Sequence, residues 1–158
     1  MTHFRYDTSG PWFKGNVHIH STASDGGKTF PELADLYATA GYDFLVRTDH
    51  WVASNATEDS TASPLLWLDG IEFDGVGPDG EYGHVLCLGK VETTTRAEGL
   101  VPAVNAARAQ GALCILAHPQ WTGNALDTCV RWHLDGVEIY NHVRSEEHTS
   151  ELQSLLII

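Results

Sequence analysis

The chain has 158 residues, a formal net charge of -12, 42% hydrophobic residues and 19% charged residues. This length and composition are typical of one globular domain with a hydrophobic core. No apolar run is long enough to span a bilayer, and the N-terminus lacks the apolar segment of a secretory signal. We therefore expect a cytoplasmic protein with no membrane partner, and the acidic charge argues against binding of extended nucleic acid.

Strand-like and helix-like patterns alternate along the chain, which indicates an α/β fold with a largely parallel sheet. No repeat or linker divides these segments, so we expect one domain. The segments expected as strands are 16–20, 42–50, 63–73, 84–92, 112–119 and 135–141. The segments expected as helices are 29–41, 95–111 and 124–133.

Local signals mark the ends of the first two helices and one turn. The segments 29–32 and 95–98 both match the capping box of a helix N-terminus. Gly41 and Gly111 suit the C-terminal ends of the same helices. The sequence Gly-Pro-Asp-Gly at 77–80 predicts a turn between two strands.

Histidines and acids gather at the ends of the expected strands. His18 and His20 are two apart in a strand, so their side chains share a face. If the turn at 77–80 joins a hairpin, Glu72 and His84 lie opposite each other. Imidazoles and carboxylates suit Zn, Mn or Fe, and in barrel enzymes the carboxyl ends of the strands form the site. Each residue alone has a structural explanation, but the joint placement favours a metal cluster. The remaining members are Asp49, His50 and His118.

The ordered motifs "HIHSTASDG", "TDH", "GIEFDG…GHVLCLG" and "LAHP" resemble the PHP family, named for polymerase and histidinol phosphatase. The resemblance covers residues 15–141. It implies a distorted seven-stranded β/α barrel of the TIM-like kind, truncated here before its last strand. It also implies two or three divalent metal ions (Zn, Mn or Fe) at one end of the barrel.

The resemblance also implies a set of metal ligands. They are His18, His20, Asp25, His50, Glu72, His84 and His118. Glu72 is implied as the carboxylate that bridges two ions, and Asp49 lies beside the ligand His50; these two acids are our candidate catalytic residues. The family pattern further includes an Asp-x-His motif on the last strand, which this chain lacks.

Three other residues are open to interpretation. Glu138 alternates with its neighbours on the last expected strand, so we expect it to point into the barrel beside the ligands. The resemblance implies that Asn141 lines the pocket. Arg47 is expected either to contact a phosphate or to pair with an acid.

The segment Arg144–Ser154, "RSEEHTSELQS", resembles the translation of a common sequencing-library adapter. We therefore expect residues 1–143 to be an incomplete PHP domain and residues 144–158 to be a non-native tail without functional information. Loss of the last strand would leave an open strand edge in the barrel.

The implied activity is that of a metal-dependent phosphoesterase, in which metal-activated hydroxide hydrolyses a phosphate ester of a small molecule or nucleotide. The same ligands suit an amidohydrolase-like metallohydrolase of a C–O or C–N bond, because a fold does not determine its chemistry. A non-catalytic metal-binding module is a third interpretation of the truncated form. We expect a small phosphorylated substrate, and the sequence leaves the oligomeric state open.

Overall fold

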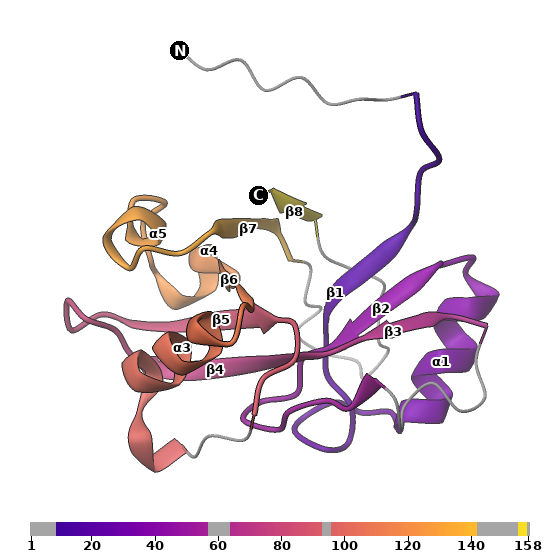
Figure 1. Cartoon of the computed structure of the whole chain (residues 1–158), viewed down its shortest axis with the longest axis horizontal. Coiled ribbons are helices and arrows are strands. Elements are labelled where there is room, and N and C mark those ends of the chain that lie inside the picture. The colour runs from indigo at the N-terminus through magenta and orange to yellow at the C-terminus, as the bar shows by residue number, and fades with distance from the viewer. Residues whose placement is uncertain (1–8, 57–63, 93–95, 142–154, 158) are drawn as a thin grey trace.

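The computed structural model describes residues 9–56, 64–92, 96–141 and 155–157, which form a mixed α/β fold with two sheets (Figure 1). The first sheet is parallel and has the order β1-β2-β3. The second is mixed and has the order β4-β5-β6-β7-β8. The strands of the first sheet are β1 Gly15–Ile19, β2 Phe44–Arg47 and β3 Leu66–Leu68. The strands of the second are β4 Gly70–Val76, β5 Tyr82–Leu88, β6 Leu113–Leu116, β7 Gly136–Tyr140 and β8 Leu155–Ile157.

Each sheet packs against its own helices. The helix α1 lies beside the first sheet, and α3 lies beside β4 and β5 of the second (Figure 1). The helical segments are α1 Phe30–Thr39, the 3-10 turn η1 Arg96–Glu98, α3 Leu100–Ala109, α4 Pro119–Thr122 and α5 Thr128–Arg131. None of the helices in the described ranges is both long and apolar enough to cross a membrane.

Local chemistry explains the ends of the helices. The Glu32 carboxylate accepts hydrogen bonds from the backbone N–H of Thr29 at 2.8 Å and from its hydroxyl at 2.6 Å, so the capping box predicted for α1 is confirmed. Gly41 follows the helix with a φ of 71°, a conformation that favours glycine. The helix α3 begins at Leu100, later than predicted, and Thr95 of its predicted capping box lies outside the described residues.

The turn predicted at 77–80 joins β4 and β5 in an antiparallel hairpin. In its register Glu72 pairs with Leu86, and Asp74 pairs with His84. Glu72 and His84 therefore share a face but are offset diagonally rather than directly opposite. Because β5 and β6 are also antiparallel, the prediction of a largely parallel sheet is wrong for the second sheet.

The segment 63–73, predicted as one strand, forms β3 and β4 in different sheets. The break lies at Asp69, whose carboxylate accepts the backbone N–H of Ala56 at 2.6 Å. A Cβ atom on Gly70 would lie 2.5 Å from a methyl group of Val46, so the chain crosses β2 closely only because this residue is glycine.

The described strands do not close into a seven-stranded barrel. On one side, an isolated parallel bridge between His50 and Glu72 joins the end of β2 to β4. On the other, the side chains of His18 on β1 and Glu138 on β7 meet at 3.0 Å. The edge of β7 that we expected to be open pairs with β8, which belongs to the segment predicted to be a non-native tail.

Alternate side chains of β4 face opposite sides of the sheet, one apolar and one polar. Ile71 and Phe73 pack into the cluster that includes α3, whereas Glu72 and Asp74 point to the opposite face. Phe73 is fully buried, and Val76 at the end of the same strand is 58% exposed. The sheet therefore rests on an apolar layer on one side and carries polar groups on the other.

We expect Phe73→Ala to lower the free energy of unfolding by about 3–5 kcal/mol, because it removes a buried ring and leaves a cavity. Val76→Ala, on the same strand, should change it by less than about 0.5 kcal/mol. Urea unfolding followed by circular dichroism measures both. Equal losses for the two variants would contradict the assigned faces of β4.

Candidate metal centre

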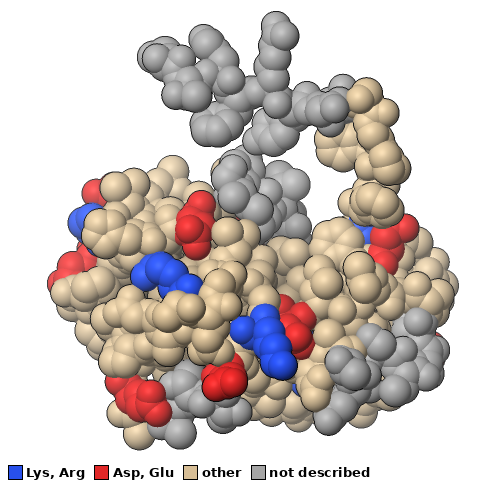
Figure 2. All heavy atoms as spheres, in the orientation of Figure 1, with Lys and Arg blue, Asp and Glu red and all other residues tan. Residues whose placement is uncertain are grey.

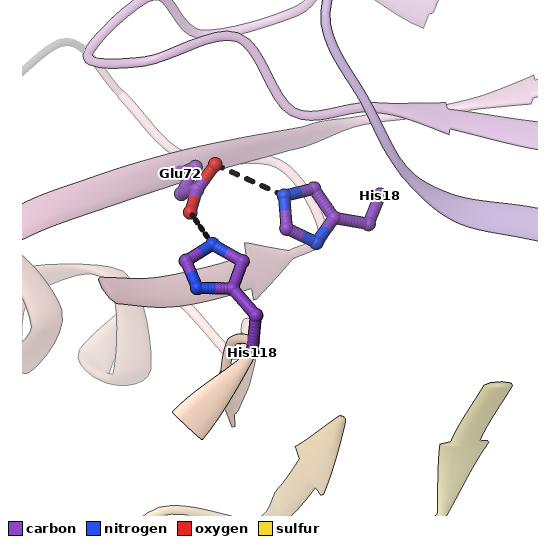
Figure 3. Close-up of side chains that lie close together, drawn as sticks. All are labelled: His18, Glu72 and His118. Atoms are coloured by element: carbon purple, nitrogen blue, oxygen red, sulfur yellow. Dashed lines mark hydrogen bonds and ion pairs between the residues drawn. The ribbon is translucent and has the colours of Figure 1, made fainter. Parts of the chain in front are cut away.

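A single buried carboxylate lies at the centre of the polar face. Glu72 is fully buried on β4, and imidazole nitrogens surround both of its oxygens. Oε1 lies 2.8 Å from His84 Nδ1 and 3.3 Å from His118 Nε2. Oε2 lies 2.9 Å from His20 Nε2, 3.1 Å from His18 Nε2 and 3.6 Å from His50 Nε2. Figure 3 shows His18 and His118 approaching the two oxygens from different elements.

The two histidines of the first motif reach this carboxylate from one face of the chain, as predicted. The pairing of β1 with β2 is irregular between Asn16 and Ile19. The Asn16 side chain anchors this region, because its amide donates to the Tyr37 hydroxyl at 2.8 Å and its oxygen accepts the His18 N–H at 3.0 Å. His18 is consequently buried, and His20 follows directly after the strand.

Asp49 holds the loop that follows β1. It accepts hydrogen bonds at 2.7 Å from the Ser21 N–H, the Ser21 hydroxyl and the Ser24 hydroxyl. Arg47 Nε lies 3.1 Å from the same carboxylate, so Arg47 pairs with an acid, one of its two predicted alternatives. Asp49 is fully buried and does not belong to any of the ligand groups found among the described residues.

The same loop presents Asp25 to the histidines. Its carboxylate oxygens lie 3.3 Å from His20 Nδ1 and 3.7 Å from His50 Nε2. A Cβ atom on Gly26 would lie 2.1 Å from the carbonyl oxygen of His20, so the close return of the loop requires glycine at this position. Asp25, which the resemblance implied as a ligand, thus lies beside two histidines of the cluster.

Glu138 orients two of the histidines. One of its oxygens lies 3.0 Å from His18 Nδ1, and the other accepts the backbone N–H of His118 at 2.8 Å. The amide of Asn141 donates to both oxygens at 3.2 and 3.1 Å. Glu138 therefore points inward beside the cluster, as expected, in the arrangement by which carboxylates orient metal-binding imidazoles.

Buried opposite charges shift the pKa values of His18 and Glu72. Burial disfavours the charged form of His18, yet the charge of Glu72 and a hydrogen bond to Glu138 raise its pKa to about 10. Burial also opposes ionisation of Glu72, but the charge of His18 and hydrogen bonds from the histidines hold its pKa well below its usual range. Without a metal, the centre therefore contains an imidazolium and a carboxylate.

Three groups of ligand atoms, each within 4.8 Å of one another, offer places for a cation. They are His18, Glu72 and His118; His20, Asp25 and His50; and His50, Glu72 and His84. The Nδ1 atoms of His50 and His118 are buried without a hydrogen-bond partner in the described part of the chain. In addition, His18 Nε2 and His20 Nε2 lie only 3.1 Å apart. Once His18 has lost its proton, imidazole nitrogens and carboxylate oxygens packed this closely fit divalent cations with mixed nitrogen and oxygen ligands.

Two of the three non-glycine residues with a positive φ in the described part of the chain lie at the cluster, and the third, His133, lies in the turn between α5 and β7. His118 has a φ of 23° and Trp51, directly after His50, has a φ of 57°. Residues other than glycine adopt positive φ values rarely, and the cost is accepted mainly where the surroundings enforce the geometry. Both strained residues follow the end of a strand and aim a histidine at Glu72.

Sequence reasoning missed a second carboxylate on the same face. Asp74 accepts hydrogen bonds from Trp51 Nε1 at 2.7 Å, the Tyr82 hydroxyl at 2.7 Å, and Arg96 at 2.8 and 2.9 Å. Because Asp74 lies two residues after Glu72 on a strand, alternation alone could have identified it. No sequence signal pointed to Arg96, which comes from a distant turn.

Neither a protein-family profile nor a curated protein matches this sequence. Among solved structures, a protein from Bifidobacterium adolescentis, assigned by inference as a metal-dependent phosphoesterase, is 16% identical with a TM-score of 0.62; the match covers 83% of this chain and 79% of the other. A two-domain protein from Bacteroides vulgatus that contains a predicted PHP-like metal-dependent phosphoesterase is 15% identical with a TM-score of 0.50, covering 80% and 50%.

An amidohydrolase from Chromobacterium violaceum is 23% identical with a TM-score of 0.42 over 61% of this chain and 32% of the other. Only the first two likenesses are close enough in shape to compare folds. The chain therefore shares a mixed α/β fold with these two structures, one assigned as a metal-dependent phosphoesterase and the other containing a PHP-like one, whereas the closed seven-stranded barrel that the motifs implied is not confirmed.

Proposed function

We propose that the protein is a metal-dependent phosphoesterase of the PHP family that hydrolyses a phosphate ester of a small molecule or nucleotide. The observation that carries this proposal is the buried Glu72 carboxylate with five imidazoles arranged around its two oxygens. Hydrolysis of phosphate esters commonly uses two or more cations held a few ångströms apart by a shared carboxylate.

We assign the ligand roles to the residues of the three overlapping groups. These are His18, His20, Asp25, His50, Glu72, His84 and His118. Since Glu72 and His50 each belong to two groups, the arrangement suits two or three ions, and the mixed donors suit Zn, Mn or Fe. When bound, such ions neutralise phosphoryl oxygens and lower the pKa of water.

Two acids outside this set support it. Glu138 holds the His18 ring so that Nε2 faces Glu72. Asp49 holds the loop that carries Asp25, so we assign it a positioning role, although the sequence made it a candidate catalytic residue. Glu72 remains the bridging carboxylate of the proposal.

The pocket beside the cluster suits a small substrate. Its volume is about 380 Å³, and its lining residues are Ser24, Asp25, His50, Asp74, His84 and Arg96. This size is typical of small-molecule sites. On the face in Figure 2, Lys and Arg are scattered among acidic residues, and the whole chain carries a net charge of -12, which favours a small ester over extended nucleic acid.

We further propose that the complete domain is a seven-stranded barrel whose last strand supplies the missing Asp-x-His ligands. In this interpretation residues 144–158 are a non-native tail. The antiparallel pairing of β8 with β7 supports the idea that this edge accommodates an additional strand.

Divalent cations should stabilise the wild-type protein, because a ligand that binds only the folded state adds about 2.7 kcal/mol at one hundred times its Kd. Glu72→Gln should remove most of the increase, since two groups share this carboxylate. Calorimetric titration with Mn²⁺ or Zn²⁺ and thermal unfolding measure the effect. Glu81→Gln, which removes a half-exposed carboxylate elsewhere, is the matched control; equal ion binding by Glu72→Gln and the control would refute the assignment.

Binding of these ions should release protons, because the raised pKa of about 10 leaves His18 protonated at pH 7 in the metal-free protein. The affinity should therefore rise with pH, by about tenfold per unit for each proton released. Calorimetry in two buffers of different ionisation enthalpy counts the protons. A buffer-independent heat, with an affinity that does not change between pH 7 and pH 8, would argue against His18 as a ligand.

The Mn²⁺-loaded protein should hydrolyse small phosphomonoesters, lose this activity with a chelator, and regain it with metal. Glu138→Gln should lower kcat/KM by about 10- to 100-fold through the misoriented His18, and Glu81→Gln should leave it unchanged. Phosphate release over a substrate panel measures this. Turnover of amides or lactones without phosphate esters would replace the proposal with the alternative of a C–O or C–N metallohydrolase.

A further inference from the structure

Arg96 lines the pocket, and its side chain contacts Asp74 and Trp51. Its two terminal nitrogens donate to the two oxygens of Asp74 at 2.8 and 2.9 Å. Its guanidinium also lies 5.4 Å from the centre of the Trp51 ring. These bonds use two of the five N–H groups of an arginine, and the Arg96 side chain is 62% exposed. The remaining donors are thus oriented and accessible.

The base of this arrangement is rigid and lies next to the metal ligands. Asp74 is only 7% exposed and also accepts hydrogen bonds from Trp51 and Tyr82. One of its oxygens lies 3.5 Å from His50 Nδ1, so the same carboxylate faces a proposed ligand and Arg96. Any group that contacts Arg96 in the pocket therefore lies beside the proposed reaction centre.

Charge indicates what Arg96 recognises. Among the six residues that line the pocket, Arg96 carries the only arginine or lysine charge, and Asp25 and Asp74 are acidic. The charge of Arg96 neutralises that of Asp74. Asp74 accepts four hydrogen bonds, and only two of them come from Arg96, so the outer N–H groups of Arg96 remain for a ligand. Planar donors of this kind match carboxylate and phosphate oxygens.

We propose that Arg96, held by Asp74, binds a second anionic group of the substrate, a phosphate or a carboxylate, while the reacting phosphate lies at the metal cluster. This inference rests on the proposed function and adds the substrate class, an ester that carries a further negative charge. A charged hydrogen-bonded contact of this type changes affinity by about 10- to 100-fold.

Three substrates test the proposal with the Mn²⁺-loaded full chain. Glycerol 2-phosphate has a neutral remainder, 3-phosphoglycerate adds a carboxylate, and fructose 1,6-bisphosphate adds a phosphate. We expect kcat/KM to be about 10- to 100-fold higher for at least one doubly charged ester, and which ester it is distinguishes the two anions. Arg96→Met should remove the preference, because it lowers kcat/KM for the doubly charged esters more than for glycerol 2-phosphate. Arg108→Gln, which changes a partly exposed arginine on α3, is the control.

Equal losses on all three substrates, or no preference in the wild type, would overturn the proposal. Arg96→Lys keeps the charge but not the paired donors, and it should recover part of the preference; thermal unfolding checks that each variant is folded. If the wild type hydrolyses none of the esters, the proposed function fails by itself. The intact bisphosphate is then titrated calorimetrically: binding weakened by Arg96→Met supports the anion site, and absent or unchanged binding refutes it.

Discussion

The carboxylate of Glu72 is the charge around which the two sheets are organised. Transferring an ion from water into a protein interior costs several kcal/mol unless opposite charge and hydrogen bonds surround it. Here the compensating groups come from β1, from the ends of β2 and β6, and from β5. A segment that moved away would leave part of this charge unpaired. The burial of one side chain thus links β4 to β1 and to the end of β2, which belong to the other sheet.

A second tier of acids holds the groups that face Glu72. Glu138 contacts both His18 and the backbone of His118, Asp49 holds the loop after β1, and Asp74 lies beside His50. Each is at least nine-tenths buried and has its oxygens occupied by several donors or partners. The centre is therefore preorganised by carboxylates, and the apolar cluster on the far side of β4 keeps that strand in place.

Much of the site could be predicted from the sequence, because its residues follow strand ends in short motifs. The shared face of His18 and His20 and the hairpin near 77–80 are local signals that held in the structure. The division of 63–73 could not be predicted, since it depends on the close passage of Gly70 over Val46 in another strand. Arg96 was equally invisible, because its partner Asp74 lies 22 residues away and no motif connects them.

The strand directions in the second sheet were also predicted wrongly. The alternating order of strands and helices is typical of parallel sheets, but the tight turn at 77–80 leaves no room for a crossover and makes β4 and β5 antiparallel. The same turn brought His84 to Glu72. The turn at 77–80 thus predicted part of the site correctly, whereas the alternating order of strands and helices predicted the wrong strand direction.

The residues that meet in the centre are separated by very different lengths of chain, and these lengths suggest the order in which their contacts form during folding. Glu72 and His84 are 12 residues apart and meet as soon as the hairpin closes, whereas His18 and Glu138 are separated by 120 residues. Because closing a longer loop costs more chain entropy, contacts between distant segments form late and slow the folding of a domain. We therefore expect the contact between Glu72 and His84 to form early in folding, and the contact between His18 and Glu138 to form only when the distant segments of the described domain come together.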